Sequence, residues 1–127
     1  MQELANVNWL AVIVGTIVSF LVGWAWYSSM LFGKKWAEGS GVELGKANDM
    51  PIMAMASNLV ALFLLALVVG ITATQDMLVT AIVAILACSV FVFSMGGYIK
   101  KSSYAKIVDL FYIIVAGIVM IICQGIF

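Results

Sequence analysis

Residues 58–69 read NLVALFLLALVV, and every residue after Asn58 in this stretch is apolar. A strand of a membrane barrel would instead alternate apolar and polar side chains over about ten positions. In a bilayer every backbone N–H and C=O group must find a partner within the protein, and a continuous apolar segment achieves this by forming a helix. The stretch therefore predicts a helix that crosses a membrane.

Four segments of the chain have the character of a spanning helix, which needs roughly 20 mostly apolar residues. Their predicted bounds are residues 9–32, 51–73, 76–98 and 103–127. Asn8 and Asp76 are placed to cap the first and third helices, and Pro51 suits the first turn of the second. Because only Thr74 and Gln75 separate the second helix from the third, these two helices form an antiparallel hairpin.

The composition supports this assignment and excludes several kinds of chemistry. Hydrophobic residues make up 65% of the 127 residues and charged residues only 9%, whereas soluble domains carry about 25% charged residues. The predicted fold class is therefore all-α integral membrane, a four-transmembrane-helix bundle forming one domain over residues 1–127. The chain has no histidine, and its six basic residues are all lysines. We expect no catalytic site, no metal, no cofactor and no nucleic-acid partner, so the chain is predicted not to be an enzyme.

The lysines give the topology. Lys34, Lys35 and Lys46 lie in the connection 33–50 between the first and second helices. The other three lysines, at positions 100, 101 and 106, lie in or beside the connection between the third and fourth helices. These two regions lie on the same face of the membrane, which the positive-inside rule identifies as cytoplasmic. Both termini are then extracytoplasmic. Trp26, Trp36, Lys34 and Lys35 are predicted to anchor the chain at the interface, and the connection allows a short interfacial helix.

Three short motifs surround the first helix: Asn8-Trp9-Leu10, Trp26-Tyr27-Ser28 and Leu31-Phe32-Gly33-Lys34-Lys35-Trp36. In this order they resemble the DUF1761 family of small bacterial membrane proteins of unknown function, although Ser29 stands where the family pattern has proline. The likeness is strongest over about the first 40 residues and extends more weakly to the later helices. It implies a four-helix architecture and a place in the bacterial cytoplasmic (inner) membrane. It implies no activity.

Small residues recur at every fourth position of the first helix, as Ala11, Gly15, Ser19 and Gly23. Such a stripe lets a second helix approach closely, and in lipid close packing replaces the hydrophobic drive. The pattern predicts a helix-packing face. Its partner is either another helix of this chain or a second copy.

Asp109 is the acid that lies clearly inside a predicted span, and an ionisable residue at such a position is a candidate functional group. Five polar residues are predicted at a similar depth: Asn58, Tyr27, Tyr112, Ser94 and Tyr98. Three interpretations remain open. In the first, Asp109 binds a cation or a proton in a polar pocket. In the second, it fixes the helix packing, either by pairing with Lys106 or by accepting hydrogen bonds from Tyr27 and Asn58. In the third, it lies among the lipid headgroups and has little effect.

The functional hypotheses follow these interpretations. The first is an oligomeric structural or accessory component of the membrane, with the lipid bilayer and either a homo-oligomer or a larger membrane complex as partners. The alternative is a small oligomeric transporter or channel that uses the polar site at Asp109. A membrane enzyme is a third class, which the lack of histidine and arginine disfavours.

Overall fold

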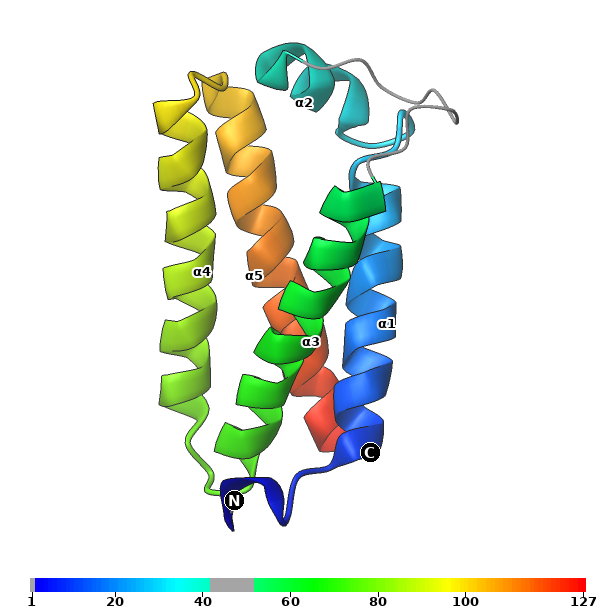
Figure 1. Ribbon diagram of the computed structural model, residues 1–127, viewed down its shortest axis with the longest axis vertical. Coiled ribbons are helices and arrows are strands. Elements are labelled where there is room, and N and C mark those ends of the chain that lie inside the picture. Colours follow the sequence, from blue (N-terminus) through cyan, green and yellow to red (C-terminus); the bar gives the residue numbers. More distant parts are fainter. Residues whose placement is uncertain (1, 42–51) are drawn as a thin grey trace.

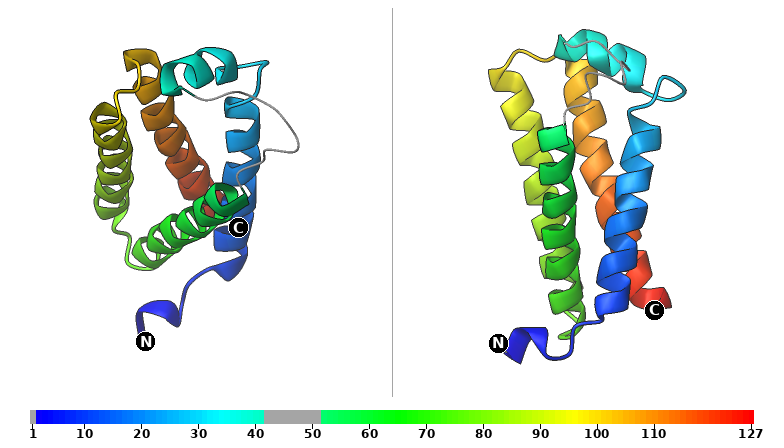
Figure 2. Two further views of the ribbon diagram at one scale, coloured as in Figure 1. Left: turned by 45° about the horizontal axis from the view of Figure 1, so that its top comes forward. Right: turned by 45° about the vertical axis from the view of Figure 1, so that its right-hand side comes forward.

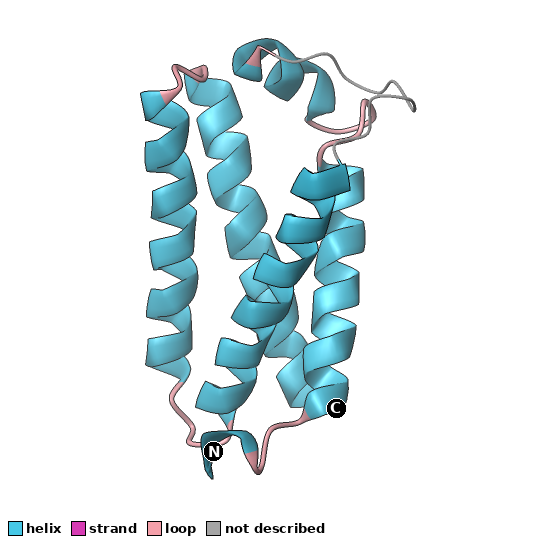
Figure 3. Ribbon diagram, viewed as in Figure 1, coloured by secondary structure: helices cyan, strands magenta, loops and turns pink. Residues whose placement is uncertain are grey.

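The computed structural model describes residues 2–41 and 52–127, and this part of the chain is helical without a strand (Figures 1 and 3). A short 3-10 helix, Gln2–Leu4, precedes five α-helices. The helices are α1 (Trp9–Trp26), α2 (Gly33–Ser40), α3 (Ile52–Ala73), α4 (Leu78–Tyr98) and α5 (Ser103–Ile126). Four of them, α1, α3, α4 and α5, are long and apolar enough to cross a membrane, as the sequence predicts.

The four long helices stand side by side, and the short helix α2 lies across one end of the bundle (Figures 1 and 2). This end also holds the turn between α4 and α5, while both termini lie at the opposite end. We call it the lysine-bearing end, because it carries Lys34 and Lys35 in α2, and Lys100 and Lys101 in the turn. Of the four long helices α5 has the largest buried share, since it contacts α1, α3 and α4.

The packing face predicted on α1 meets α5 of the same chain. Ala11, Gly15, Ser19 and Gly23 are all buried. A Cβ atom placed on Gly15 would lie 3.5 Å from the Met120 Cα atom, which is ordinary contact, so the two backbones are close. The Ser19 hydroxyl donates to the Ala116 carbonyl at 3.4 Å, and the Tyr112 hydroxyl donates to the Ser19 carbonyl at 2.9 Å. The small residues thus seat α1 against α5.

A tight turn ends α1 at Trp26, six positions before the predicted end at residue 32. In this turn the N–H of Phe32 donates to the Trp26 carbonyl at 3.2 Å, and that of Gly33 to the Ser28 carbonyl at 2.9 Å. A side chain at Gly33 would collide with the Tyr27 carbonyl, so the turn requires glycine there. The chain reverses and begins α2, the short helix that the sequence allows in this connection.

The start of α4 also differs from the prediction. The helix begins at Leu78, its N-cap is Met77, and no side chain caps it. Asp76 adopts a left-handed conformation with φ of 54° in the turn, so the predicted capping role of Asp76 is wrong. The predicted start of the second span at Pro51 lies outside the described residues. The cap predicted for α1 is present, because the Asn8 side chain accepts from the Ala11 N–H at 3.1 Å.

Candidate functional site

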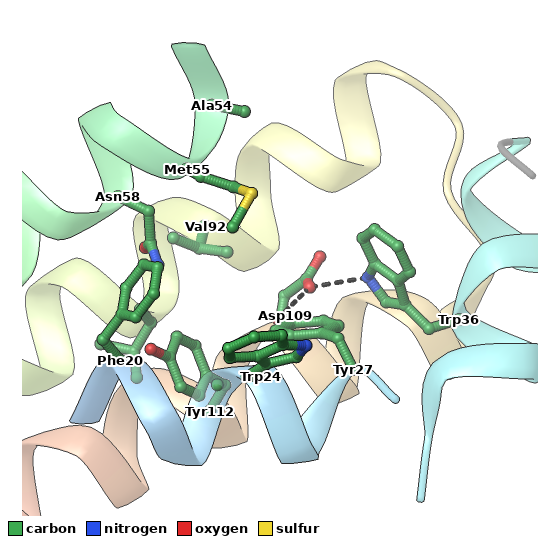
Figure 4. Close-up of a pocket in the computed structure, with 12 residues that line it drawn as sticks. Phe20, Trp24, Tyr27, Trp36, Ala54, Met55, Asn58, Val92, Asp109 and Tyr112 are labelled. Carbon is green, nitrogen blue, oxygen red and sulfur yellow. Dashed lines mark hydrogen bonds between the residues drawn. The ribbon is translucent and has the colours of Figure 1, made fainter. Parts of the chain in front are cut away.

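Asp109 lies in α5 near the lysine-bearing end, and it is only 5% exposed. Its Oδ1 atom accepts hydrogen bonds from the Tyr27 hydroxyl at 2.6 Å and from the Trp36 Nε1 atom at 2.8 Å (Figure 4). Its Oδ2 atom pairs with the Lys101 ammonium at 2.7 Å. The three donors come from the end of α1, from α2 and from the turn between α4 and α5. One carboxylate therefore joins three separate segments.

Local structure brings these donors together. The Ser102 side chain caps α5 by accepting from the Ala105 N–H at 3.1 Å, while its own N–H donates to the Gly39 carbonyl at 2.9 Å. This second bond docks α2 on the start of α5. Lys100 adopts φ of 59° in the preceding turn, which directs the chain so that Lys101 reaches Asp109.

Aromatic contacts reinforce the same arrangement. The Lys101 ammonium lies 5.3 Å from the centroid of the Trp36 ring, within the range of a cation–π interaction. Tyr27 packs edge-on against Trp36 and Tyr112, with ring centroids 4.8 and 5.6 Å apart. Trp26 donates from Nε1 to the Val108 carbonyl at 3.0 Å. The carboxylate is thus enclosed by rings that also fix the direction of its donors.

A cavity of about 410 Å³ lies beside this cluster, between α1, α2, α3, α4 and α5 (Figure 4). Five of its lining residues are aromatic, and the polar ones are few. The lining consists of Phe20, Gly23, Trp24, Tyr27, Trp36, Ala54, Met55, Asn58, Val92, Asp109, Tyr112 and Ile113. Cavities of this size and mostly apolar character are typical of small-molecule sites.

The charge of the carboxylate is balanced within the fold. Lys101 supplies the opposite charge, and the two neutral donors at Oδ1 add charge-assisted hydrogen bonds. Tyr27 follows the last residue of α1, and burial, together with the charge of Asp109 and the hydrogen bond to it, raises the pKa of its hydroxyl. Tyr27 therefore remains a donor to Asp109. Within residues 2–41 and 52–127, no group of three or more His, Cys, Asp and Glu residues is placed to hold a metal ion.

The structure brings together four of the six residues predicted for the polar site: Tyr27, Asn58, Asp109 and Tyr112 all line the cavity. Ser94 and Tyr98 do not line it. Both are exposed, and Tyr98 is 80% exposed. The reason is the rotation of α4, which turns Ile85, Ser89 and Gly96 toward the bundle and Ser94 away from it.

Of the partners expected for Asp109, Tyr27 is confirmed as a hydrogen-bond donor, whereas Trp36 and not Asn58 is the second donor to Oδ1. The expected ion pair with Lys106 is wrong, because the Lys106 ammonium lies 5.0 Å from the Phe93 ring centroid and Lys101 pairs with Asp109 in its place. Of the predicted interfacial anchors, Trp36 binds Asp109 and Trp26 binds the Val108 carbonyl. Lys34 and Lys35 are exposed, and the Lys35 ammonium lies 5.3 Å from the Tyr104 ring centroid. The contributions of Lys101 and Trp36 were missed because both lie outside the span that contains Asp109.

Four long apolar helices, close packing of small residues and a buried carboxylate define the class: a small helical protein with the features of a membrane bundle. The chain matches the family described as "Protein of unknown function (DUF1761)" over residues 10–125, and it belongs to that family. No match was found among curated proteins or among solved structures.

Proposed function

We propose that this protein is a non-catalytic structural or accessory component of the membrane, and that it assembles as a homo-oligomer through the outer face of α4. This face carries small and β-branched residues at alternating spacings of three and four. They are Thr80, Val83, Ala87, Val90, Ser94 and Gly97, and all six are exposed. We call these six residues the α4 stripe. The stripe is the observation that carries the proposal.

Two features of the α4 stripe favour a helix partner over lipid. Its alternating spacing of three and four residues follows the repeat of about 3.5 residues that keeps one helix in contact with another in a left-handed crossing. Small residues at such positions allow the close approach on which helix association in lipid depends. The stripe lies on the side of α4 opposite the residues that face the bundle, Ala81, Ile85, Ser89 and Gly96. Because all six residues are exposed in the described part of the chain, the stripe is accessible to a partner.

The contrast with α1 strengthens this assignment. The small residues of α1 are buried against α5 of the same chain, so they are not accessible to another copy. In α4, 17% of the most apolar window is buried, the smallest share among the four long helices. A second copy related by a two-fold axis along the membrane normal would place each residue of the stripe opposite its own counterpart.

The contacts of Asp109 support a structural role at the same time. Both carboxylate oxygens are occupied by donors from this chain, and the residue that balances the charge is Lys101. The cavity beside Asp109 favours the alternative, a transporter or channel. Transport of a cation through this site would require the ion to displace Lys101. The alternative therefore predicts that Asp109→Asn abolishes flux of the cation into proteoliposomes while oligomerisation persists.

The proposed assembly is tested by disulfide cross-linking in native membranes. In a chain whose own cysteines are replaced, Cys88→Ala and Cys123→Ala, we compare Val83→Cys with Ile82→Cys. Both positions are exposed and lie at the same depth, but Val83 belongs to the α4 stripe and Ile82 lies about 100° away around the helix. We expect oxidation to give a covalent homodimer from Val83→Cys and far less from Ile82→Cys. Equal yields at the two positions, or monomer from both, would contradict the proposal.

A further inference from the structure

We propose that the cavity beside Asp109 binds an uncharged ring compound that carries a carbonyl group, drawn from the membrane. This inference concerns a different surface from the α4 stripe and does not depend on oligomerisation. It rests on three observations: the balanced charge of the site, the aromatic walls and the unused hydrogen-bonding capacity of Asn58.

The charges of the site select a neutral ligand. Asp109 accepts from Tyr27 and Trp36 at one oxygen and pairs with Lys101 at the other, so it offers no uncompensated charge to a cation. An anion would meet the carboxylate, and the nearest ammonium is already paired. A charged ligand would therefore lose its hydration without gaining a free partner, which costs several kcal/mol.

The walls select a ring. Five aromatic side chains line the cavity of about 410 Å³: Phe20, Trp24, Tyr27, Trp36 and Tyr112. Figure 4 shows their rings along one side of the cavity, facing Met55, Asn58 and Val92. Aromatic side chains gain energy from stacking or edge contact with another π-system, in addition to the gain from burial. An alkyl chain would gain energy from burial alone. A flat ligand of one or two fused rings gains energy both from burial and from contact with the aromatic rings.

Asn58 selects the carbonyl group. Its side chain projects from α3 into the cavity and lies beside the Tyr112 hydroxyl (Figure 4). That hydroxyl donates its hydrogen to the Ser19 carbonyl, so toward Asn58 it acts as an acceptor. A carboxamide has two N–H donors, and the Tyr112 oxygen takes at most one of them. Among the described residues the other N–H has no hydrogen-bond partner, so Asn58 is placed to donate to a ligand oxygen in the cavity.

The cavity is also reachable from the side of the bundle. Trp24, which is 64% exposed, and Ala54 line the cavity and reach the surface of the described protein. They lie on α1 and α3, two helices that could face lipid. A lipophilic ring compound can enter from the bilayer by this route, whereas a strongly hydrated solute would have to cross apolar surface.

The test uses menadione, a neutral naphthoquinone, with the full-length protein in lipid nanodiscs. Trp24 and Trp36 line the cavity, and a bound quinone quenches their fluorescence. We expect saturable quenching by menadione. Asn58→Leu should weaken binding about 3- to 10-fold, the loss of one neutral hydrogen bond. Ser57→Ala is the matched control and should bind as the original chain does, because Ser57 is exposed and its hydroxyl donates to the Met53 carbonyl.

A second variant and two charged probes complete the test. Val92→Phe should fill part of the cavity and abolish binding, with an unfolding temperature within a few degrees of that of the original chain. Naphthoquinone sulfonate and naphthyltrimethylammonium should fail to compete with menadione. The proposal is overturned if quenching does not saturate, if Asn58→Leu and Val92→Phe bind as well as the original chain, or if the ammonium compound competes as strongly as menadione itself.

Discussion

The pair formed by Asp109 and Lys101 gives a quantitative prediction at the scale of single residues. The two side chains are 6% and 17% exposed, so each shields the other's charge in a largely dry environment. Asp109→Asn should lower the free energy of unfolding by about 2–4 kcal/mol, because the charge-assisted hydrogen bonds weaken and Lys101 loses its partner. Lys101→Met should cost about 1–3 kcal/mol. The free energy of unfolding lost in the double variant should be smaller, by at least about 1 kcal/mol, than the sum of the losses in the two single variants.

The matched control for this cycle is Lys106, which lies three residues before Asp109 on the same helix. Its ammonium lies over the Phe93 ring, so Lys106→Met and Asp109→Asn should be additive within about 0.5 kcal/mol. Reversible unfolding in mixed micelles measures the free energy of unfolding of each single and double variant. Strong coupling of Asp109 to Lys106, with none to Lys101, would refute the assigned pairing.

Part of this site could be predicted from the sequence, and the reason the rest could not is physical. Depth along each span places Asn58, Asp109 and Tyr112 in one layer, since a helix rises 1.5 Å per residue. Helix periodicity then suggests Lys106 as the partner of Asp109. Lys101 lies before α5 begins, and its approach depends on the backbone of Lys100, whose φ is 59°. Trp36 reaches the site because α2 folds back over the bundle, which no periodic pattern encodes.

At the scale of the helices, the small residues of α1 differ sharply in what they tolerate. A Cβ atom on Gly23 would lie 2.6 Å from the Tyr112 hydroxyl oxygen, whereas one on Gly15 would meet Met120 at 3.5 Å. Gly23→Ala should therefore displace Tyr112 from the Ser19 carbonyl and cost about 1–3 kcal/mol by overpacking. Gly15→Ala should be neutral, or stabilising by up to about 1 kcal/mol, because alanine has a higher helix propensity than glycine.

Unfolding of these two variants in the same micelles checks the prediction, and the fluorescence of the neighbouring Trp26 reports whether Tyr112 moves, since their ring centroids lie 6.5 Å apart. Equal stability of Gly23→Ala and Gly15→Ala would show that α1 and α5 can separate at this end without cost. Both substitutions add one methyl group to the same face of the same helix, so a difference in stability between them reports how tightly each site is packed.

The helices themselves were predictable to different degrees. Continuous apolar runs identify α3, α4 and α5, because a span in lipid needs length and apolarity more than any particular residue. The rotation of α4 about its axis was not predictable, since its residues are apolar on every side and offer no contrast. Ser94 and Tyr98 were therefore assigned to the polar site and lie outside it. The end of α1 depends on the close approach of Gly33 to the Tyr27 carbonyl, a local feature without periodic signature.

At the scale of the whole molecule, the arrangement of charge predicts orientation in a membrane. The described lysines all lie at or near the end that holds α2 and the turn between α4 and α5, and both termini lie at the other end (Figure 1). Orientation follows the number of basic residues beside each span, counted as the chain inserts, so Lys101 contributes although Asp109 later neutralises it. The lysine-bearing end should therefore be cytoplasmic.

This orientation is measured by thiol labelling of intact bacterial cells, with Cys88 and Cys123 replaced by alanine. Gln75→Cys lies in the turn between α3 and α4, and Ser103→Cys lies at the start of α5, and both positions are exposed. A membrane-impermeant maleimide should label Gln75→Cys in intact cells and Ser103→Cys only after permeabilisation. The opposite pattern would place the cavity and Asp109 on the extracytoplasmic side. Labelling of both positions in intact cells would mean two orientations, and the α4 stripes of neighbouring copies could then also meet antiparallel.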